Sequence, residues 1–335
     1  MCIFNDKVNN MYLIGAGFDK AVFGCDVPLN DEVLCRLIEQ NNFLPELKQS
    51  IDLYQQTDYA KNDIEMYLTW LDTKVIGGSQ DAKKIRKEIT EKIANYFIKF
   101  NFAKFYEKNK QSKETNYKYN VEWCEKFVTQ VLKNNDIIIN LNYTTFLEGL
   151  LDNYEFWNLR GGYSSVSNWV FEEKLENNNN IKNIIIYKIH GSVSFCYELS
   201  GNDLQIYVDE QTFPKTYKKV HPFGDYAKTY IIAPSYIKIP HKDIRKIIVE
   251  AIEKVKYAKK LIIMGCGLRD EDYLLKLILQ SFFSRESQKK VVIVDPNADE
   301  ITARVLNTFD IQEENIEKKY NIEEWVSNVI KKDCI

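Results

Sequence analysis

Short apolar runs separated by amphipathic stretches dominate the chain. Six of these runs predict β-strands, because each is a few residues long and ends at small or polar residues. They are Met11–Ile14, Ile137–Leu141, Ile184–Ile189, Tyr230–Ala233, Leu261–Met264 and Val291–Val294. Several of them show no clean alternation of apolar and polar residues, which is typical of strands buried on both faces of a parallel sheet.

Helical periodicity fills the intervals between the C-terminal strands. Asp243–Tyr257 places its isoleucines on one stripe, and Asp272–Phe283 and Asp299–Phe309 follow the same pattern. Strands that alternate with helices in this way predict right-handed βαβ crossovers. We therefore expect an α/β fold, with a Rossmann-like parallel sheet flanked by helices.

A large helical insertion is expected after the first strand. No run between Asn30 and Val131 predicts a strand, whereas Lys84–Phe100 carries a clear apolar face, so residues 30–131 are assigned to the insertion. A smaller loop insertion is expected over 154–183, and a loop without periodicity over 108–120. The whole chain, 1–335, is then a single domain.

Composition excludes several classes of protein. Lys and Arg number 45 against 48 Asp and Glu, a net charge of −3, which argues against binding nucleic acid or an anionic membrane by bulk charge. No uncharged apolar run approaches the ~18 residues of a membrane span, and the N-terminus lacks a secretory signal pattern. The seven Cys are scattered without a C-x-x-C pair, so neither a disulfide scaffold nor a zinc ribbon is predicted. We expect a cytoplasmic protein.

Two glycine-containing segments follow predicted strands, one at Gly15-Ala16-Gly17 and one at Gly265-Cys266-Gly267. Glycines at the carboxyl end of a strand let backbone N–H groups approach a phosphate closely. The alternative for the first segment is a tight turn that needs a positive φ. Asp19 also has two interpretations, as an acceptor for a ribose hydroxyl or as the N-cap of the next helix.

Three further strand ends carry polar side chains. Asn142 emerges with Tyr143 and Thr144, and its carboxamide can donate and accept hydrogen bonds at once; alternatively, Asn142 or Thr144 caps the following helix. His190 is one of only three His, so histidines alone cannot build a metal cluster; it is either a general base or a buried core residue. Asp295 is placed to accept from an adenosine ribose.

Taken in order, the strand-end segments GAGFD, NYT, HG, GCGL and VDP resemble the sirtuin-like superfamily, especially its bacterial defence branches and the AbiH abortive-infection family. The resemblance implies a Rossmann-like fold with inserted subdomains that binds NAD. GFD and NYT are similar to AbiH, whereas sirtuin deacetylases carry Ser in the first segment and Asn-x-Asp in the second, where this chain has Thr144. The paired cysteines of the deacetylase zinc module are absent, so we expect no zinc.

The resemblance further implies that NAD⁺ is the substrate and that its nicotinamide–ribose bond is hydrolysed to deplete NAD⁺ in anti-phage defence. Asn142 and His190 would then be the catalytic residues. The expected cofactor-binding residues are Gly15, Ala16, Gly17, Phe18, Asp19, Tyr143, Gly191, Gly265, Cys266, Gly267 and Asp295. An alternative is a sensor that binds NAD⁺ or ADP-ribose without hydrolysing it and acts through a partner protein.

A free NAD hydrolase would poison its own cell. We therefore expect the active form to be a homo-oligomer or a complex with a partner defence protein. Neither a membrane nor directly bound nucleic acid is an expected partner, and a nuclease is disfavoured because no clustered carboxylate metal site is evident.

Overall fold

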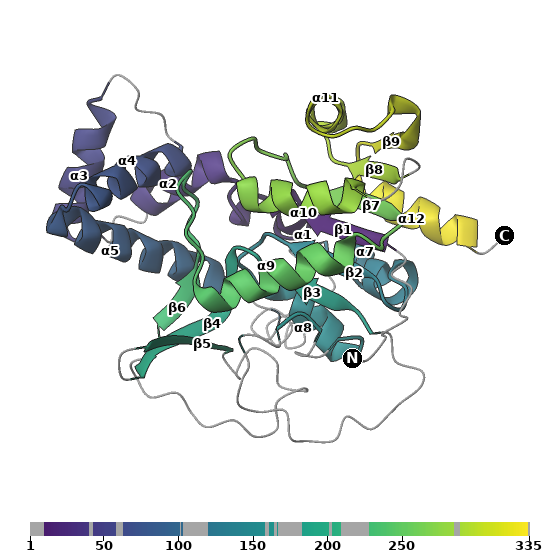
Figure 1. The fold of residues 1–335 in the computed structure, drawn as a ribbon, viewed down its shortest axis with the longest axis horizontal. Coiled ribbons are helices and arrows are strands. Elements are labelled where there is room, and N and C mark those ends of the chain that lie inside the picture. Colours follow the sequence, from purple (N-terminus) through teal and green to yellow (C-terminus); the bar gives the residue numbers. More distant parts are fainter. Residues whose placement is uncertain are drawn as a thin grey trace.

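A six-stranded parallel sheet forms the centre of the molecule in the computed structural model (Figure 1). The structure describes residues 10–39, 43–57, 63–100, 102, 120–157, 161–163, 166, 183–200, 203–208, 228–284 and 289–333. The sheet consists of β1 (Asn10–Ile14), β2 (Ile137–Asn140), β3 (Ile185–Tyr187), β7 (Lys260–Met264), β8 (Lys290–Val294) and β9 (Ile316–Lys319). Its inner strands are apolar and almost wholly buried, as expected for strands covered on both faces.

The strand order of this sheet is β3-β2-β1-β7-β8-β9, and every neighbouring pair is parallel. From β1 the chain builds outward through β2 and β3 on one side, and it later returns to β7 on the other side of β1. The order therefore reverses at β1, and in open α/β sheets ligands bind at such a switch point, beyond the carboxyl ends of the strands. The predicted Rossmann-like fold is confirmed.

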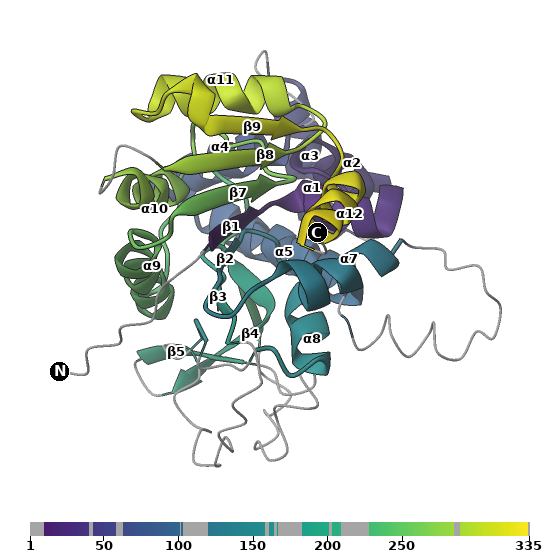
Figure 2. The ribbon, with the colours of Figure 1, turned by 90° about the vertical axis from the view of Figure 1, so that its right-hand side faces the viewer.

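Helices cover both faces of the sheet (Figure 2). Helices α9 and α10 pack against each other on one face, and α1, α7, α8 and α12 lie on the other, while α11 packs against β8 and β9. Their bounds are α1 (Ala16–Phe23), α7 (Glu122–Lys126), α8 (Phe146–Asn153), α9 (Lys242–Val255), α10 (Tyr273–Phe283), α11 (Ala298–Thr308) and α12 (Ile322–Asp333). The three predicted C-terminal helices are thus found within about one turn of their expected ends.

Between α1 and α7 the described residues form mostly helices, as predicted, and four of these helices gather at one end of the molecule (Figure 1). They are α2 (Asn30–Glu39), α3 (Pro45–Gln55), α4 (Ile64–Ile76) and α5 (Gln80–Phe97). Helix α5 begins earlier than the expected Lys84 because Ser79 caps it by accepting from the N–H of Ala82. Tyr96 and Phe97 are buried in the core.

A second, antiparallel sheet corrects one strand assignment. The run predicted as Tyr230–Ala233 forms β6 (Lys228–Ile231), which pairs with β4 (Gly191–Ser200) instead of joining the parallel sheet, and β4 also pairs with β5 (Asp203–Val208). A short apolar run specifies a strand but not its partner. Strands β4, β5 and β9 escape prediction because their sequences mix apolar and polar residues.

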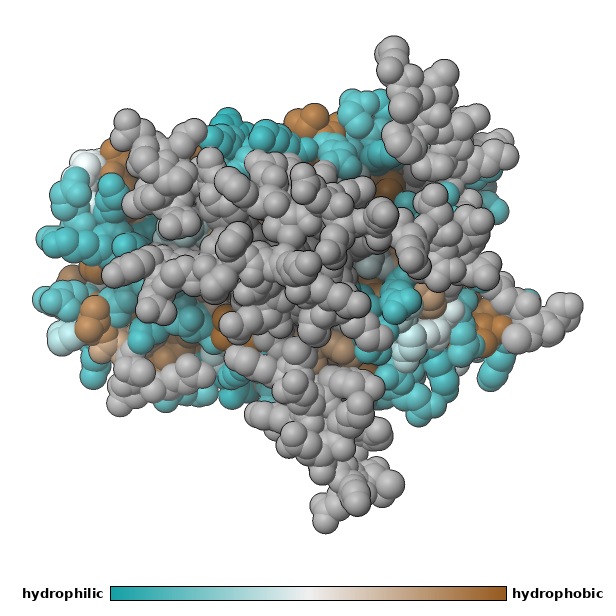
Figure 3. All heavy atoms as spheres, turned by 90° about the horizontal axis from the view of Figure 1, so that it is seen from below, coloured by the Kyte–Doolittle hydropathy of each residue, from teal (hydrophilic) through white to brown (hydrophobic). Residues whose placement is uncertain are grey.

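Within the described residues, no helix is both long and apolar enough to cross a membrane. Seen from below, the described residues are largely hydrophilic, with hydrophobic side chains in separate groups (Figure 3). All but the last residue of the expected loop over 108–120, and most of the expected insertion over 154–183, lie outside the described residues.

Candidate functional site

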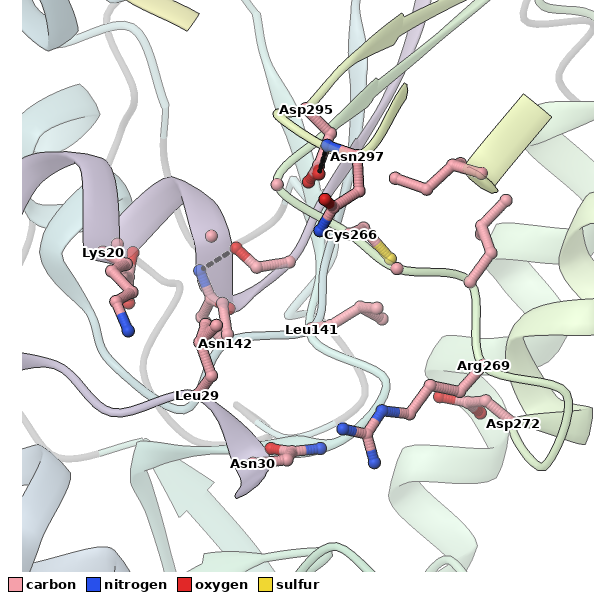
Figure 4. A pocket seen from close by; sticks show the side chains of 18 of the residues that line it. Lys20, Leu29, Asn30, Leu141, Asn142, Cys266, Arg269, Asp272, Asp295 and Asn297 are labelled. Atoms are coloured by element: carbon pink, nitrogen blue, oxygen red, sulfur yellow. Dashed lines mark hydrogen bonds between the residues drawn. The ribbon is translucent and has the colours of Figure 1, made fainter. Parts of the chain in front are cut away.

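A cavity of about 870 Å³ opens at the carboxyl ends of the parallel strands. Residues that follow β1, β2, β3, β7 and β8 all contribute to its lining, so the five strand-end segments converge on one site. Figure 4 shows Asn142, Cys266 and Asp295 on these segments, with Asn30 and Arg269 near one another beside the cavity. The volume lies in the range of small-molecule and cofactor sites.

The glycines after β1 let that segment pack directly against the segment after β7. A Cβ at Gly15 would lie 2.5 Å from Gly265 O, and one at Gly17 would lie 2.7 Å from Gly265 Cα. The positive φ, 58°, belongs to Gly265, so the alternative of a positive-φ turn at Gly15–Gly17 is wrong. Close backbone approach explains these glycines instead.

This packing also changes the expected role of the first segment as a phosphate cradle. Gly15 N donates to Met264 O at 3.1 Å, and Gly17 N donates to Gly265 O at 2.8 Å. Two of the N–H groups expected to face a phosphate are therefore bonded to the neighbouring strand end. They join the two glycine segments into one backbone layer at the switch point between β1 and β7.

Asn142 lies directly over this layer. Its side-chain Nδ2 donates to Gly15 O at 3.0 Å, and its backbone N–H donates to Asn140 Oδ1 at 3.0 Å. The residue is 7% exposed and lines the cavity. Helix α8 starts after Thr145, which makes no side-chain capping bond, so the alternative in which Asn142 or Thr144 caps that helix is wrong.

Thr144 instead donates its hydroxyl hydrogen to Asp19 Oδ2, at 2.5 Å. Asp19 lies inside α1 and is 3% exposed, so it is not the N-cap of that helix. Burial raises the pKa of the Asp19 carboxyl to about 6, although the Thr144 hydrogen bond and the charge of Lys188 act in the opposite direction. A carboxyl group thus lies beside Thr144, and it comes from α1.

His190 lies in the turn between β3 and β4, where it is 9% exposed and lines the cavity. Its Nε2 is 2.9 Å from Asp272 Oδ2, without the angle of a regular hydrogen bond. Lys238 Nζ approaches the same carboxylate oxygen at 3.1 Å. The histidine is therefore a cavity residue with an acidic partner, and it is not enclosed among apolar side chains.

Asp272 is the N-cap of α10, and its Oδ1 accepts from Leu275 N at 3.3 Å. Burial by itself would raise its pKa, but the close contacts with the basic groups of His190 and Lys238 prevail and hold that pKa well below its usual range. The carboxyl group therefore stays ionised beside His190. Acids before a helix are already accounted for by the helix N-terminus, so the sequence does not reveal this second contact of Asp272.

The helical insertion forms a further wall of the cavity. Glu65, at the start of α4, accepts from Asn30 Nδ2 at 2.9 Å and from Arg269 Nη1 at 2.5 Å. All three residues line the cavity, and Glu65 is buried. No motif marks them, because they come from three separate segments that meet only in the folded chain.

Two predicted residues lie after β7 and β8 at the expected adenosine end. Cys266 lines the cavity, and burial raises the pKa of its thiol to about 12, so it is a neutral wall residue. Asp295 lines the cavity beside it, and its Oδ1 accepts from Asn297 N at 2.8 Å. Burial also raises the pKa of the Asp295 carboxyl.

Three predicted cofactor-binding residues are engaged elsewhere. Phe18 is fully buried, with its ring centroid 5.1 Å from that of Trp123. Tyr143 lines the cavity, but its hydroxyl donates to Ile232 O at 2.8 Å. Gly191 has a φ of 76° and packs against the backbone of β6. The turn and the close contact with β6 thus explain why position 191 is a glycine.

The remaining histidines are not part of the site that the structure describes. His241 is the N-cap of α9, and its Nδ1 accepts from Asp243 N at 3.3 Å, while His221 lies outside the described residues. In the described part of the chain, no group of three or more His, Cys, Asp or Glu residues is arranged to hold a metal ion. The absence of zinc stays a prediction.

Comparison with known proteins gives one family match. The family model of the SIR2-like domain matches residues 136–324, which is more than half of the chain. No curated protein matches by sequence. Among solved structures, the chain is similar to a SIR2 homologue in complex with NAD, with 12% identity, a TM-score of 0.43, and coverage of 97% of this chain and 88% of that chain. It is also similar to Sir2Tm bound to a propionylated peptide, with 11% identity, a TM-score of 0.40, and coverage of 99% and 95%.

Proposed function

This chain belongs to the SIR2-like domain family, and on that premise we propose that it binds NAD⁺ in the cavity and hydrolyses the bond between nicotinamide and ribose. One observation carries the proposal: Asn142 and His190 line the same cavity as the glycine segments after β1 and β7. The sequence separates these groups widely, and the sheet brings them to its carboxyl edge. This juxtaposition supplies both an orienting amide and a base.

The reaction suits these groups. In NAD⁺ the nicotinamide ring is a positively charged pyridinium. When its bond to the ribose breaks, nicotinamide departs as a neutral molecule, so the leaving group needs no protonation. Water then attacks the anomeric carbon, and the products are nicotinamide, ADP-ribose and a proton. The protein has to orient the ribose and the water and to accept that proton.

His190 is proposed as the proton acceptor. The ionised carboxylate of Asp272 at 2.9 Å would stabilise the imidazolium that forms. Asn142 is proposed to hold a ribose hydroxyl and the attacking water. Because Asn142 Nδ2 already donates to Gly15 O, its carboxamide orientation is set before the substrate arrives.

The other half of the dinucleotide would lie toward β8. Asp295 and Cys266 line that end of the cavity, and Asp295 is proposed to accept from the adenosine ribose. The backbone around Gly267 would allow the diphosphate to approach closely, because a Cβ there would meet only Arg304 Nη1, at 3.6 Å.

Its resemblance to AbiH in the GFD and NYT segments supports a role in abortive infection, in which NAD⁺ depletion halts phage replication. We propose that this activity is gated, with an oligomer or a partner complex as the active form. Tyr96, Phe97 and Phe100 are buried in the core, so these three aromatic residues do not support an assembly surface.

The test is nicotinamide release from NAD⁺ by the purified full chain, with and without phage lysate as the trigger. We expect the wild type to release nicotinamide. We expect Asn142→Ala to lower both the turnover rate and the affinity for NAD⁺. Tight binding of NAD⁺ or ADP-ribose without nicotinamide release under either condition would favour the alternative function, a sensor that binds the nucleotide without hydrolysing it. Absence of both binding and release would overturn the proposal.

A further inference from the structure

A buried lysine holds the segment that carries Asn142. Lys188 follows β3, its side chain is 0% exposed, and its Nζ donates to Asn142 O and, at 2.7 Å, to Thr144 O. The third contact of the ammonium group is Glu148 Oε1 on α8, at 3.1 Å. An ammonium group has three N–H donors, and its two hydrogen bonds and one ion pair all fall within the seven residues from Asn142 to Glu148.

The backbone carbonyl of Tyr143, which lies between the two carbonyls bound by Lys188, also has a partner. Val193 N, in β4, donates to Tyr143 O at 2.9 Å. Each backbone carbonyl from Asn142 to Thr144 is therefore bonded to the stretch Lys188–Val193. That stretch also contains His190, and its turn is closed by Gly191 N donating to Lys188 O at 3.3 Å.

Glu148 keeps the lysine in place. It is fully buried, and its Oε1 also accepts from Tyr163 OH at 3.1 Å and from Asn140 Nδ2 at 3.3 Å. A buried ion pair contributes little net stability compared with apolar residues of the same volume, so stability alone gives a weak reason for this arrangement. Orientation of the segment Asn142–Thr144 is a direct reason for keeping this buried ion pair.

We propose that Lys188, held by Glu148, is a positioning residue that sets Asn142 relative to His190. The proposal rests on the proposed function of these two residues. Lys188 does not line the cavity, and it acts through the backbone of the segment Asn142–Thr144. A loop released from these bonds would move the Asn142 carboxamide, and displacements near 1 Å cost about 10²-fold in rate.

The experiment compares Lys188→Met with a matched control, Lys289→Met. Lys289 is also buried, at 3% exposure, and its Nζ donates to the backbone carbonyls of Lys256, at 3.2 Å, and Ala258. It precedes β8, at the amino edge of the sheet, opposite the cavity. Both variants lose a buried ammonium group, but only Lys188→Met frees the Asn142 segment.

We expect Lys188→Met to lower kcat about 10²-fold per folded molecule with a smaller change in KM, and Lys289→Met to leave kcat within about twofold of the wild type. Should Lys188→Met fail to fold, the double variant Lys188→Met/Glu148→Met removes both charges at similar volume and carries the same expectation. Wild-type kcat in a folded variant that lacks the lysine would overturn the positioning role.

Hydrogen exchange separates this role from the proposed function. Faster amide exchange over residues 141–146 is expected in Lys188→Met and not in Lys289→Met, whether or not the chain acts on NAD⁺. If the wild type neither binds nor cleaves NAD⁺, the proposed function fails. The exchange measurement still tests whether Lys188 holds the Asn142 segment in place. Unchanged exchange in Lys188→Met would show that the lysine does not hold the segment.

Discussion

Asp272 Oδ2 lies 2.9 Å from His190 Nε2, while Oδ1 of the same carboxylate caps helix α10. One side chain thus ties a cavity histidine to a helix N-terminus. Because Lys238 also approaches Oδ2, at 3.1 Å, the carboxylate is held between two basic groups. This arrangement leads to the first two predictions.

Replacing His190 with alanine should lower nicotinamide release about 10²–10⁴-fold, because the reaction loses its proton acceptor. The fold should persist, since His190 lines a cavity and Asp272 keeps its contacts with Lys238 and α10. Release rates and thermal unfolding of the same preparation check this. A variant that melts much earlier but turns over normally while folded would show that His190 is a structural residue.

Replacing Asp272 with asparagine should reduce turnover at least tenfold and destabilise the fold by about 3 kcal/mol at pH 7, because Lys238 loses its buried partner. The pKa of Asp272 is lowered from 3.8, so the stabilisation is complete above that pH and is lost as the pH falls further. Denaturant unfolding across this range checks the sign. A gap between wild type and variant that widens toward acid would contradict it.

Replacing Asp19 with asparagine should stabilise the protein at pH 7. Burial raises the pKa of Asp19 from 3.8 to about 6, so wild-type stability falls as the pH rises through that window, by about 3 kcal/mol in all. Asparagine can still accept from Thr144 and carries no charge. Melting temperatures should diverge above about pH 6 and converge below about pH 4, whereas Thr144→Val should destabilise. Equal melting curves at pH 8 would refute the assignment.

Replacing Gly17 with alanine should destabilise the fold by about 1–3 kcal/mol and weaken NAD⁺ binding, because the new Cβ would lie 2.7 Å from Gly265 Cα. Gly77→Ala is the matched control, since a Cβ there makes ordinary contacts of 3.4 and 3.5 Å. Denaturation and calorimetric titration of both variants measure the difference. Equal tolerance of the two alanines would mean that the glycine segments can separate without cost.

Turnover should depend on assembly. A gated hydrolase is expected to elute as an oligomer or a partner complex when it is active, and dilution to the monomer should reduce the rate per chain. Size-exclusion chromatography coupled to a nicotinamide assay measures both quantities in one run. Full turnover in a dilute monomer peak would exclude this form of control.

The sequence by itself determined the parallel sheet, because its inner strands are apolar runs that only burial on both faces accommodates. It also determined which strand ends carry polar side chains: Asn142, His190 and Asp295 each follow such a run, and β-sheet geometry brings the carboxyl ends of parallel strands to one edge. Local pattern was sufficient for these features. The helices α5, α9, α10 and α11 followed from it as well.

Only the tertiary structure decided the partners of these side chains. Asp272 with His190, Thr144 with Asp19, and Lys188 with the carbonyl of Asn142 are all pairs distant in the chain. Local periodicity records which face of an element is buried but not what lies opposite, so long-range contacts between polar groups leave no signature in one sequence. The same holds for the glycines: a side chain at Gly15 or Gly17 would collide with the segment after β7, at Gly265 and Cys266, which is distant in the sequence.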